Sequence, residues 1–318
     1  MAGARKYGNA SPPVAVLYGG FSGEREVSLE SGAAVAKALE EAGLATKLVD
    51  VRPDFTEAGR AALEGCGCAF IALHGEFGED GGVQRLLEAW GVPYTGSGPE
   101  ASALAMDKVA SKERFLERGV PTAGSVTCAA SALAAGEWPD GLDALDWPVV
   151  VKPALAGSSL GISIVERPEG LAEAGVRAAE HGGVALVERF VPGREVTVGV
   201  LADEALPVVE LETAQNFYDY EAKYRDGRTR YVVPAEIPDE VTARVQEAGL
   251  AAFRALGCRS FGRTDLRLDP SGRPFVLEVN TIPGFTSHSL LPKAAAAAGV
   301  PFPELCRRIV KMAAPRRR

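Results

Sequence analysis

Short apolar runs alternate with helical patterns over the first third of the chain. The runs VAVLY, TKLVD and AFIAL are separated by segments near 27–42 and 83–90 in which apolar residues recur at helical spacing. Strands that alternate with helices form parallel sheets with helices on their faces. We therefore predict a parallel α/β unit over residues 1–107. Its first strand leads into Gly19-Gly20-Phe21-Ser22-Gly23, and ligands of such sheets gather at these strand ends.

A different pattern follows over residues 108–192. A helix is predicted near 110–118, then a polar and alanine-rich stretch, then the strands PVVVKP and ISIV on either side of Gly157-Ser158-Ser159-Leu160-Gly161. Glycines allow backbone N–H groups to approach a phosphate closely. A glycine-rich hairpin is also often only a turn. We expect a small α+β unit whose glycine loop forms a flap.

Antiparallel strands are predicted over residues 193–318. REVTVGVL and PVVEL are short apolar strands, a helix is expected near 239–256, and SFGRTDLRL and RPFVLEVN form a hairpin around Asp269-Pro270-Ser271-Gly272. A final helical segment follows. Residues 213–229, TAQNFYDYEAKYRDGRT, lack periodicity, and a loop of this length inside a domain is typically functional.

Composition limits the classes of partner. The chain has 318 residues, 47% of them apolar and 24% charged, with a net charge of −8, which argues against a nucleic-acid-binding surface. No stretch approaches the ~18 apolar residues of a membrane span, and no export signal is evident. The five cysteines are an odd number in a chain that needs no disulfides. We expect a cytoplasmic protein that acts on small molecules.

The hairpin brings acidic side chains together. Because side chains alternate faces along a strand, we expect Val276, Glu278 and Asn280 to share one face, with Asp265 opposite or diagonal to Glu278 within about 8 Å. Two carboxylates and a carboxamide oxygen suit Mg²⁺ bound together with phosphate oxygens. The alternative is an ordinary ladder of charged side chains on the surface, in which Arg263 and Arg267 neutralise Asp265.

Phosphate binding needs cations and backbone donors. The chain has no G-x-x-x-x-G-K-[ST] loop, so it is not a P-loop enzyme. Lys108, Lys152 at the end of a predicted strand, and the flap around Gly157 are the candidates instead.

Taken together, these features resemble the ATP-grasp ligases, and among them the D-alanine–D-alanine ligase family. The resemblance is carried by seven ordered motifs, GGFSGEREVSLESG, IALHGEFGEDG, PYTGSGPEASALAMDK, VVKPALAGSSLGIS, FYDYEAKY, GRTDLRL and EVNTIPGFTSHSL. It implies an α/β (α+β ATP-grasp) fold with an N-terminal parallel Rossmann-like (pre-ATP-grasp) sheet, a central small α+β subdomain and a C-terminal antiparallel-sheet subdomain. ATP would lie between the last two.

The resemblance also implies a reaction. ATP would phosphorylate the carboxylate of one D-alanine, and the amine of a second D-alanine would displace phosphate, giving D-alanyl-D-alanine for peptidoglycan. ATP and two Mg²⁺ (or Mn²⁺) ions would be the cofactors, and the family suggests a homodimer.

Site residues follow from matching motif positions. The resemblance implies phosphate contacts from Lys108, Lys152, Gly157, Ser158, Ser159 and, at the γ-phosphate, Lys223. It implies adenine contacts from Glu188 and Phe217, a ribose contact from Glu195, and metal ligation by Asp265, Glu278 and Asn280.

Glu24 would bind the ammonium group of the first D-alanine, with His74 nearby. Arg263 and the Gly284 N–H would stabilise the tetrahedral oxyanion. Without the resemblance, Glu24 is an ordinary helix-start carboxylate and His74 a buried polar residue.

Ser289 and Leu290 stand at an expected helix start and would receive the second carboxylate; a serine there is more often only a cap. Ser158 and Tyr224 would hydrogen-bond to Glu24 and close a lid. The Tyr224 hydroxyl favours an amine as second substrate, because related D-lactate-using enzymes differ at this tyrosine or in this loop.

Two other classes of protein are alternatives. A dehydrogenase would use the glycine turn and Asp50, but no G-x-G-x-x-G run is present. A nucleotide-binding regulatory protein could keep the fold without the chemistry. Departures from the family pattern are Ala154-Leu155-Ala156 in the flap, where polar residues are usual, and the GRTD sequence, where an apolar residue often precedes the aspartate.

Overall fold

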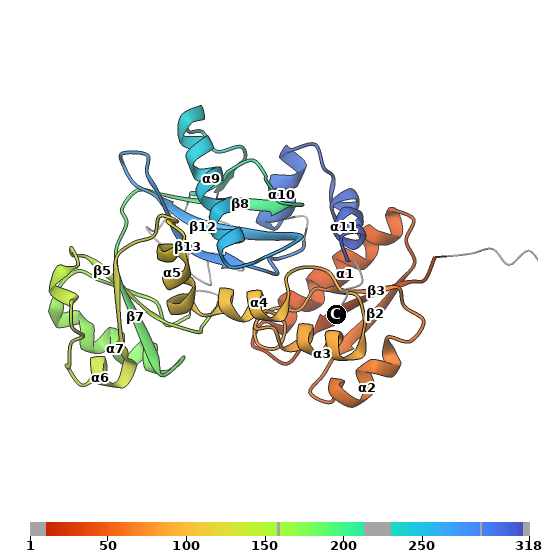
Figure 1. Ribbon diagram of the computed structural model, residues 1–318, viewed down its shortest axis with the longest axis horizontal. Helices are drawn as coiled ribbons and strands as arrows, with labels where there is room; N and C mark the ends of the chain where they lie inside the picture. The colour runs from red at the N-terminus through yellow and green to blue at the C-terminus, as the bar shows by residue number, and fades with distance from the viewer. Residues whose placement is uncertain (1–10, 158–159, 213–229, 287, 314–318) are drawn as a thin grey trace, which may run out of the picture.

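Three β-sheets follow one another along the molecule. The computed structural model describes residues 11–157, 160–212, 230–286 and 288–313. Figure 1 shows the parallel sheet with α1, α2 and α3 at one end, the sheet that contains β5 and β7 at the other, and the largest sheet between them. The largest sheet therefore lies between the parallel N-terminal sheet and the sheet that contains β5 and β7.

The N-terminal sheet is parallel, as predicted, with the order β2-β1-β3. Its central strand is almost completely buried because helices cover both faces. Its elements are β1 (Val14–Gly19), α1 (Arg25–Glu41), β2 (Thr46–Val51), α2 (Phe55–Ala62), β3 (Cys68–Ile71), α3 (Gly82–Trp90) and α4 (Pro99–Met106). The sequence analysis did not identify α2 or α4.

The central sheet is antiparallel, with the order β4-β7-β5-β6. Its region contains α5 (Lys108–Glu117), β4 (Ser125–Ala129), α6 (Ala130–Ala134), β5 (Val149–Pro153), β6 (Ser163–Val165), α7 (Leu171–Ala179) and β7 (Val184–Arg189). The two strands that flank the flap were predicted, whereas β4, β7, α6 and α7 were missed. Many alanines in this region reduce the contrast between apolar and polar positions on which periodicity depends.

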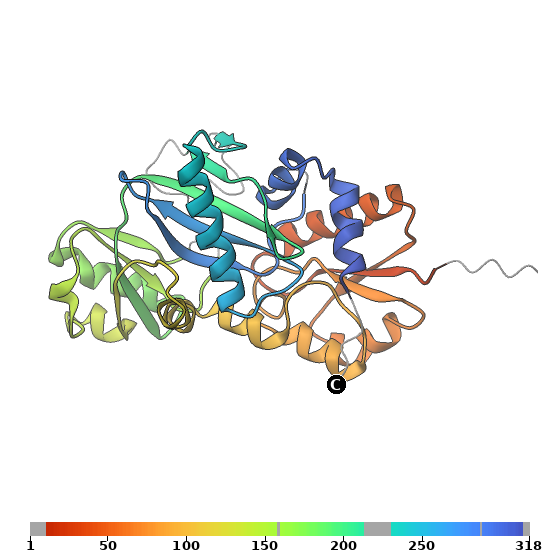
Figure 2. The same ribbon diagram turned by 45° about the horizontal axis from the view of Figure 1, so that its top comes forward.

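The C-terminal sheet is antiparallel, with the order β11-β10-β8-β12-β13, and β9 pairs with β8. Its elements are β8 (Arg194–Leu201), β9 (Glu204–Ala205), β10 (Val209–Glu212), β11 (Arg230–Val232), α9 (Asp239–Ala255), β12 (Phe261–Leu268), β13 (Pro274–Asn280), α10 (Leu290–Ala297) and α11 (Phe302–Lys311). Figure 2 shows α9 lying across one face of this sheet. The other face carries Asp265 and its neighbours.

Each sheet falls within one of the predicted units, 1–107, 108–192 and 193–318, and the boundaries themselves stay a prediction. Phe115 of α5 packs in the core beneath the C-terminal sheet with Val196 and Phe253. The helix that begins at Lys108 is therefore anchored to that sheet.

A β-bulge in the hairpin corrects one expectation. Asp265 pairs with Glu278, but the next pair is Leu266 with Val276, so Leu277 is an extra residue. Val276 is fully buried on the opposite face, and the prediction that it shares the face of Glu278 and Asn280 is wrong. Leu277 takes its place beside Glu278. Sequence alternation alone does not reveal a bulge, because the extra residue is apolar like its neighbours.

Candidate active site

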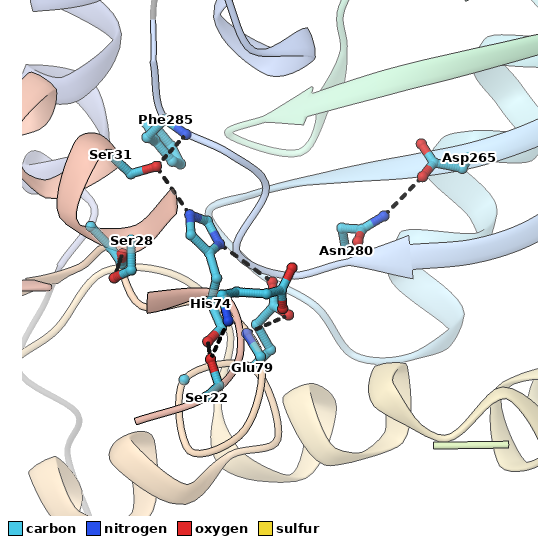
Figure 3. A network of polar contacts seen from close by, with 12 residues as sticks. Ser22, Ser28, Ser31, His74, Glu79, Asp265, Asn280 and Phe285 are labelled. Atoms are coloured by element: carbon cyan, nitrogen blue, oxygen red, sulfur yellow. Dashed lines mark hydrogen bonds and ion pairs between the residues drawn. The ribbon is translucent and has the colours of Figure 1, made fainter. Parts of the chain in front are cut away.

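Asp265 lies at the centre of a row of polar side chains across three strands. It pairs with Thr197 of β8 on one side and with Glu278 of β13 on the other. Its carboxylate accepts hydrogen bonds from Arg263 Nε at 2.7 Å and Nη2 at 2.8 Å, and from Thr197 Oγ1 at 2.7 Å. Asn280 Nδ2 donates a further bond at 3.0 Å (Figure 3). The hairpin therefore gathers the predicted metal ligands, and Thr197 is a contact that the sequence did not indicate.

Each of the two carboxylates has a cationic neighbour. Arg263 makes a two-pronged ion pair with Asp265, as the surface-ladder alternative requires. Lys108 Nζ lies 3.2 Å from Glu278 Oε2. Arg267 does not share in this neutralisation, because it turns to Glu195 instead. The repulsion expected between two adjacent carboxylates is thus offset on both sides.

The donor set suits a hard cation. Asn280 donates its amide nitrogen to Asp265, so its carboxamide oxygen is not used in that bond. All-oxygen sets of this kind bind Mg²⁺ together with substrate phosphates. Among the described residues, no three or more histidine, cysteine or acidic side chains are grouped so that they could hold a metal ion by themselves.

Two lysines hold one buried carboxylate in the central region. Lys152 of β5 pairs with Glu188 Oε1, and Lys112 Nζ lies 3.0 Å from Glu188 Oε2. Burial opposes ionisation of Glu188, but the two lysines outweigh it and hold its pKa below the ordinary value. Burial lowers the pKa of Lys112, which Glu188 only partly offsets. Two cations on one carboxylate form a cluster that favours an added anion.

Lys112 was missed, although the sequence contains a signal for it. Asp107 caps α5 by accepting bonds from the N–H groups of Val109 and Ala110 at 3.0 and 3.1 Å. Lys108 and Lys112 then stand four residues apart on the same face of the helix. Lys112 Nζ also donates to Thr122 Oγ1 at 2.8 Å.

A small cavity of about 70 Å³ lies between the central and C-terminal sheets. Its lining includes six of the predicted nucleotide or metal residues, together with Arg267 and Leu277. The predicted ones are Lys108, Lys152, Glu188 and Glu195, joined by Asp265 and Glu278. We refer to it as the small cavity.

A large cavity of about 330 Å³ lies between the N-terminal and C-terminal sheets. Every residue predicted to bind the amino-acid substrates lines it: Glu24, His74, Arg263, Gly284, Ser289 and Leu290. Lys108, Gly157, Glu278 and Asn280 line it as well. We refer to it as the large cavity, and Lys108 and Glu278 belong to the walls of both cavities.

His74 connects two parts of the large cavity (Figure 3). Its Nε2 lies 3.0 Å from Ser31 Oγ, which accepts a hydrogen bond from the Phe285 N–H at 3.4 Å. Its Nδ1 lies 3.7 Å from Glu79 Oε1. Neither Ser31 nor Glu79 was identified from the sequence: Ser31 is 43 positions from His74, and Glu79 lies in the same loop as His74, where no regular spacing indicates a contact. A continuous polar chain thus links α1 and the loop after β3 to the loop after β13.

The loop after β13 is held in shape by Ser289. Ser289 precedes α10, and its Oγ accepts a hydrogen bond from the Thr286 N–H at 3.1 Å. A Cβ atom at Gly284 would lie 2.9 Å from Ser289 Oγ, closer than packing allows. A side chain at 284 would therefore displace the Ser289 hydroxyl, which holds the Thr286 N–H.

Asp50, the residue that a dehydrogenase would use for ribose, is already engaged. Arg25 Nη1 and Nη2 each donate to it at 2.9 Å, and these bonds lower the pKa of Asp50. Asp50 does not line either cavity.

Two protein-family models match the chain: the D-ala D-ala ligase N-terminus over residues 45–97 and the D-ala D-ala ligase C-terminus over residues 125–311. A D-alanine–D-alanine ligase from Anaeromyxobacter sp. (strain K) is 47% identical over 304 residues, which cover 95% of this chain and 96% of that protein. This chain belongs to the D-alanine–D-alanine ligase family.

Solved structures of the family have the same fold. A D-alanine–D-alanine ligase from Bacillus anthracis complexed with ATP is 31% identical with a TM-score of 0.81, covering 95% of this chain and 97% of that one. The VanG D-Ala:D-Ser ligase from Enterococcus faecalis is also 31% identical, with a TM-score of 0.82, covering 96% of this chain and all of that one. The fold is therefore shared by family members named for different second substrates.

Five family positions lie outside the described residues: Ser158, Ser159, Phe217, Lys223 and Tyr224. Their expected roles stay predictions. Within the described part of the chain, no helix is long and apolar enough to span a membrane.

Proposed function

We propose that this protein joins two D-alanine molecules at the expense of ATP, through a D-alanyl phosphate. The observation that carries the proposal is the shared wall of the two cavities. Lys108 and Glu278 line both the cavity with the predicted nucleotide residues and the cavity with the predicted amino-acid residues. A phosphoryl group at this wall could pass from one ligand to the other.

The first step is an in-line transfer. A carboxylate oxygen of the first D-alanine attacks the γ-phosphorus of ATP, the bond to the β–γ bridging oxygen breaks, and ADP leaves with the electron pair. Lys108 and Lys152 would hold the phosphates, Glu188 the adenine amino group and Glu195 the ribose. Mg²⁺ or Mn²⁺ held by Asp265, Glu278 and Asn280 would neutralise phosphate charge. The family member complexed with ATP supports this nucleotide assignment.

The second step forms the peptide bond. The amine of the second D-alanine attacks the carbonyl carbon of the acyl phosphate, its proton is released, and the C–O bond to phosphate breaks. Glu24 would hold the first ammonium group, and Ser289 and Leu290 the second carboxylate. Arg263 and the Gly284 N–H would stabilise the oxyanion. The polar chain through His74 and Ser31 would keep these donors in register.

We also propose a cytoplasmic location and a homodimer. Among the described residues all five cysteines are free thiols, which suits a reducing compartment. The family resemblance supports the dimer. Sedimentation velocity of the purified chain would decide its oligomeric state.

Phosphate release from MgATP tests the reaction. We expect release that depends on D-alanine, and mass spectrometry should identify D-alanyl-D-alanine as the product. Release without D-alanine, or none with it, would overturn the proposal. Parallel incubations with D-serine and D-lactate would reveal the second-substrate preference, and Tyr224→Phe should relax it toward D-lactate.

A further inference from the structure

Arg267 binds the segment 190–193, which connects β7 of the central sheet to β8 of the C-terminal sheet. We refer to this segment as the connection. Its Nε donates to the Val191 carbonyl oxygen at 3.0 Å and its Nη2 donates to the Gly193 carbonyl oxygen at 2.9 Å. Its Nη1 donates to Glu195 Oε2 at 3.4 Å, and its guanidinium lies 5.5 Å from the Phe190 ring centroid. One side chain therefore contacts three residues of the segment that joins β7 to β8, and Glu195 of β8.

The connection has little freedom elsewhere. Gly193 has φ +114°, and a Cβ atom there would lie 2.2 Å from the Leu268 carbonyl oxygen, so the segment passes directly against β12. The Phe190 N–H donates to the Pro148 carbonyl oxygen at 3.0 Å. Arg267 fixes the peptide groups between these two points. The planar guanidinium group, with N–H donors on three nitrogens, can bond two carbonyl groups and a carboxylate at the same time, which a lysine ammonium group cannot do in this geometry.

The connection forms part of the wall of the small cavity. Phe190, Val191, Glu195 and Arg267 itself all line it, together with Glu188. Among the residues that the structure describes, none accepts a hydrogen bond from the Val191 N–H. Val191 and Glu188 both line this cavity, so its wall contains a backbone N–H group and a carboxylate acceptor.

A donor beside an acceptor matches one purine edge better than another. Adenine offers a ring nitrogen that accepts and an exocyclic amino group that donates, whereas guanine carries the reverse pair at the same positions. A site built to make such bonds discriminates strongly, because a mismatched base leaves buried polar groups unpaired. The orientation of the Val191 peptide therefore decides which base fits.

We propose that Arg267 is a positioning residue for nucleobase selection, which holds the Val191 peptide and Glu195 so that base and ribose are read together. The inference rests on the proposed function for its nucleotide, ATP. Arg267 acts through the connection: it lines the small cavity and is absent from the lining of the large cavity, where the amino-acid substrates are proposed to bind.

Direct binding of ATP and GTP to the full chain, measured by calorimetry without turnover, tests this role. For Arg267→Met we expect about tenfold weaker ATP binding and about a tenfold smaller preference for ATP over GTP. Arg267→Lys keeps the charge but not the fork, so we expect it to lose most of the same preference. Arg254→Met removes an exposed arginine that pairs with Asp203 outside both cavities, and should change neither quantity.

Steady-state kinetics should show a raised KM for ATP with kcat changed less than about twofold. An unchanged affinity ratio in Arg267→Met, or full recovery in Arg267→Lys, would overturn the inference. If the methionine variant does not fold, the lysine variant carries the same test. Should the wild-type chain bind ATP selectively yet release no D-alanine-dependent phosphate, the proposed function fails while the role of Arg267 stands.

Discussion

Both cavities share the Lys108–Glu278 ion pair, but the residues around it are held in different ways. In the small cavity, charged groups meet directly: Lys152 and Lys112 hold Glu188, and Arg267 holds Glu195. In the large cavity, His74 is connected to the loop after β13 through the neutral Ser31 hydroxyl. The small cavity measures about 70 Å³ and the large one about 330 Å³.

This difference separates stability from turnover. Removing one member of a buried ion pair leaves a charge without its partner and destabilises the fold. Removing a neutral hydroxyl costs far less stability but releases the groups that it aligned. Substitutions around the small cavity should therefore affect folding and nucleotide binding together, whereas those around the large cavity should act mainly on substrate kinetics.

The shared wall should give the largest effect. Glu278→Gln removes a carboxylate that lines both cavities and pairs with Lys108. We expect turnover to fall by more than about 100-fold. Replacing even a residue that only hydrogen-bonds to a metal ligand typically lowers metal affinity or activity by about 10–100-fold. Glu247→Gln, at an exposed position of α9, is the control. Turnover near the wild-type value in saturating Mg²⁺ would contradict the metal assignment.

Lys112→Met tests the ion-pair character of the small cavity. Glu188 would keep only Lys152, and we expect the free energy of unfolding to fall by about 3 kcal/mol. Urea denaturation measures the change, and Lys37→Met, on an exposed face of α1, is the matched control. Equal stability of the two variants would show that the buried cluster does not contribute as the comparison requires.

Ser31→Ala tests the hydroxyl group that links His74 to the loop after β13. We expect KM for the first D-alanine to rise about tenfold, because small displacements of substrate-positioning groups are costly. Ser28→Ala is a close control: Ser28 is also fully buried on α1, but its hydroxyl donates to the Ala72 carbonyl oxygen at 2.7 Å. A similar rise of KM in both variants would mean that general loosening of α1, not the link to His74, is responsible.

The smallest effect is expected at the hairpin turn, outside both cavities. Partial burial raises the pKa of Asp269, but hydrogen bonds from Ser271 and Arg273 outweigh it and lower the pKa to about 2. Because the folded-state pKa lies below the ordinary value near 3.9, this stabilisation is present above about pH 4 and is lost toward pH 2.

Asp269→Asn should therefore lower the free energy of unfolding by about 1 kcal/mol at pH 7, after allowance for solvent screening. The difference from wild type should shrink as the pH falls, while turnover at neutral pH stays unchanged. Denaturation curves at several pH values would show this, and a difference independent of pH would refute the assignment to an ionised Asp269.

Sequence patterns were most informative where residues lie close along the chain. The hairpin with Asp265 and Glu278, the parallel N-terminal sheet and the helix start at Ser289 were all predicted and are present. Contacts between distant elements had no local signal. Ser31 and Phe285 are 254 positions apart, and Lys112 and Glu188 are 76 apart.

Loss of periodicity explains the other omissions. The strand β7 carries Glu188, yet it was not identified because its neighbours are rich in alanine and glycine. The face of Val276 was misassigned because alternation assumes an uninterrupted strand.

The bulge at Leu277 has a consequence for length variation in this hairpin. Without Leu277, Val276 would still oppose Leu266 and Glu278 would still oppose Asp265, because regular alternation gives those same pairs. A one-residue deletion at this point would preserve the pairing and remove only an apolar wall of the small cavity. A deletion in β12 between Asp265 and the turn, by contrast, would turn side chains to the wrong face. The strand can therefore gain or lose a side chain that lines the small cavity at one position without disturbing its acidic residues.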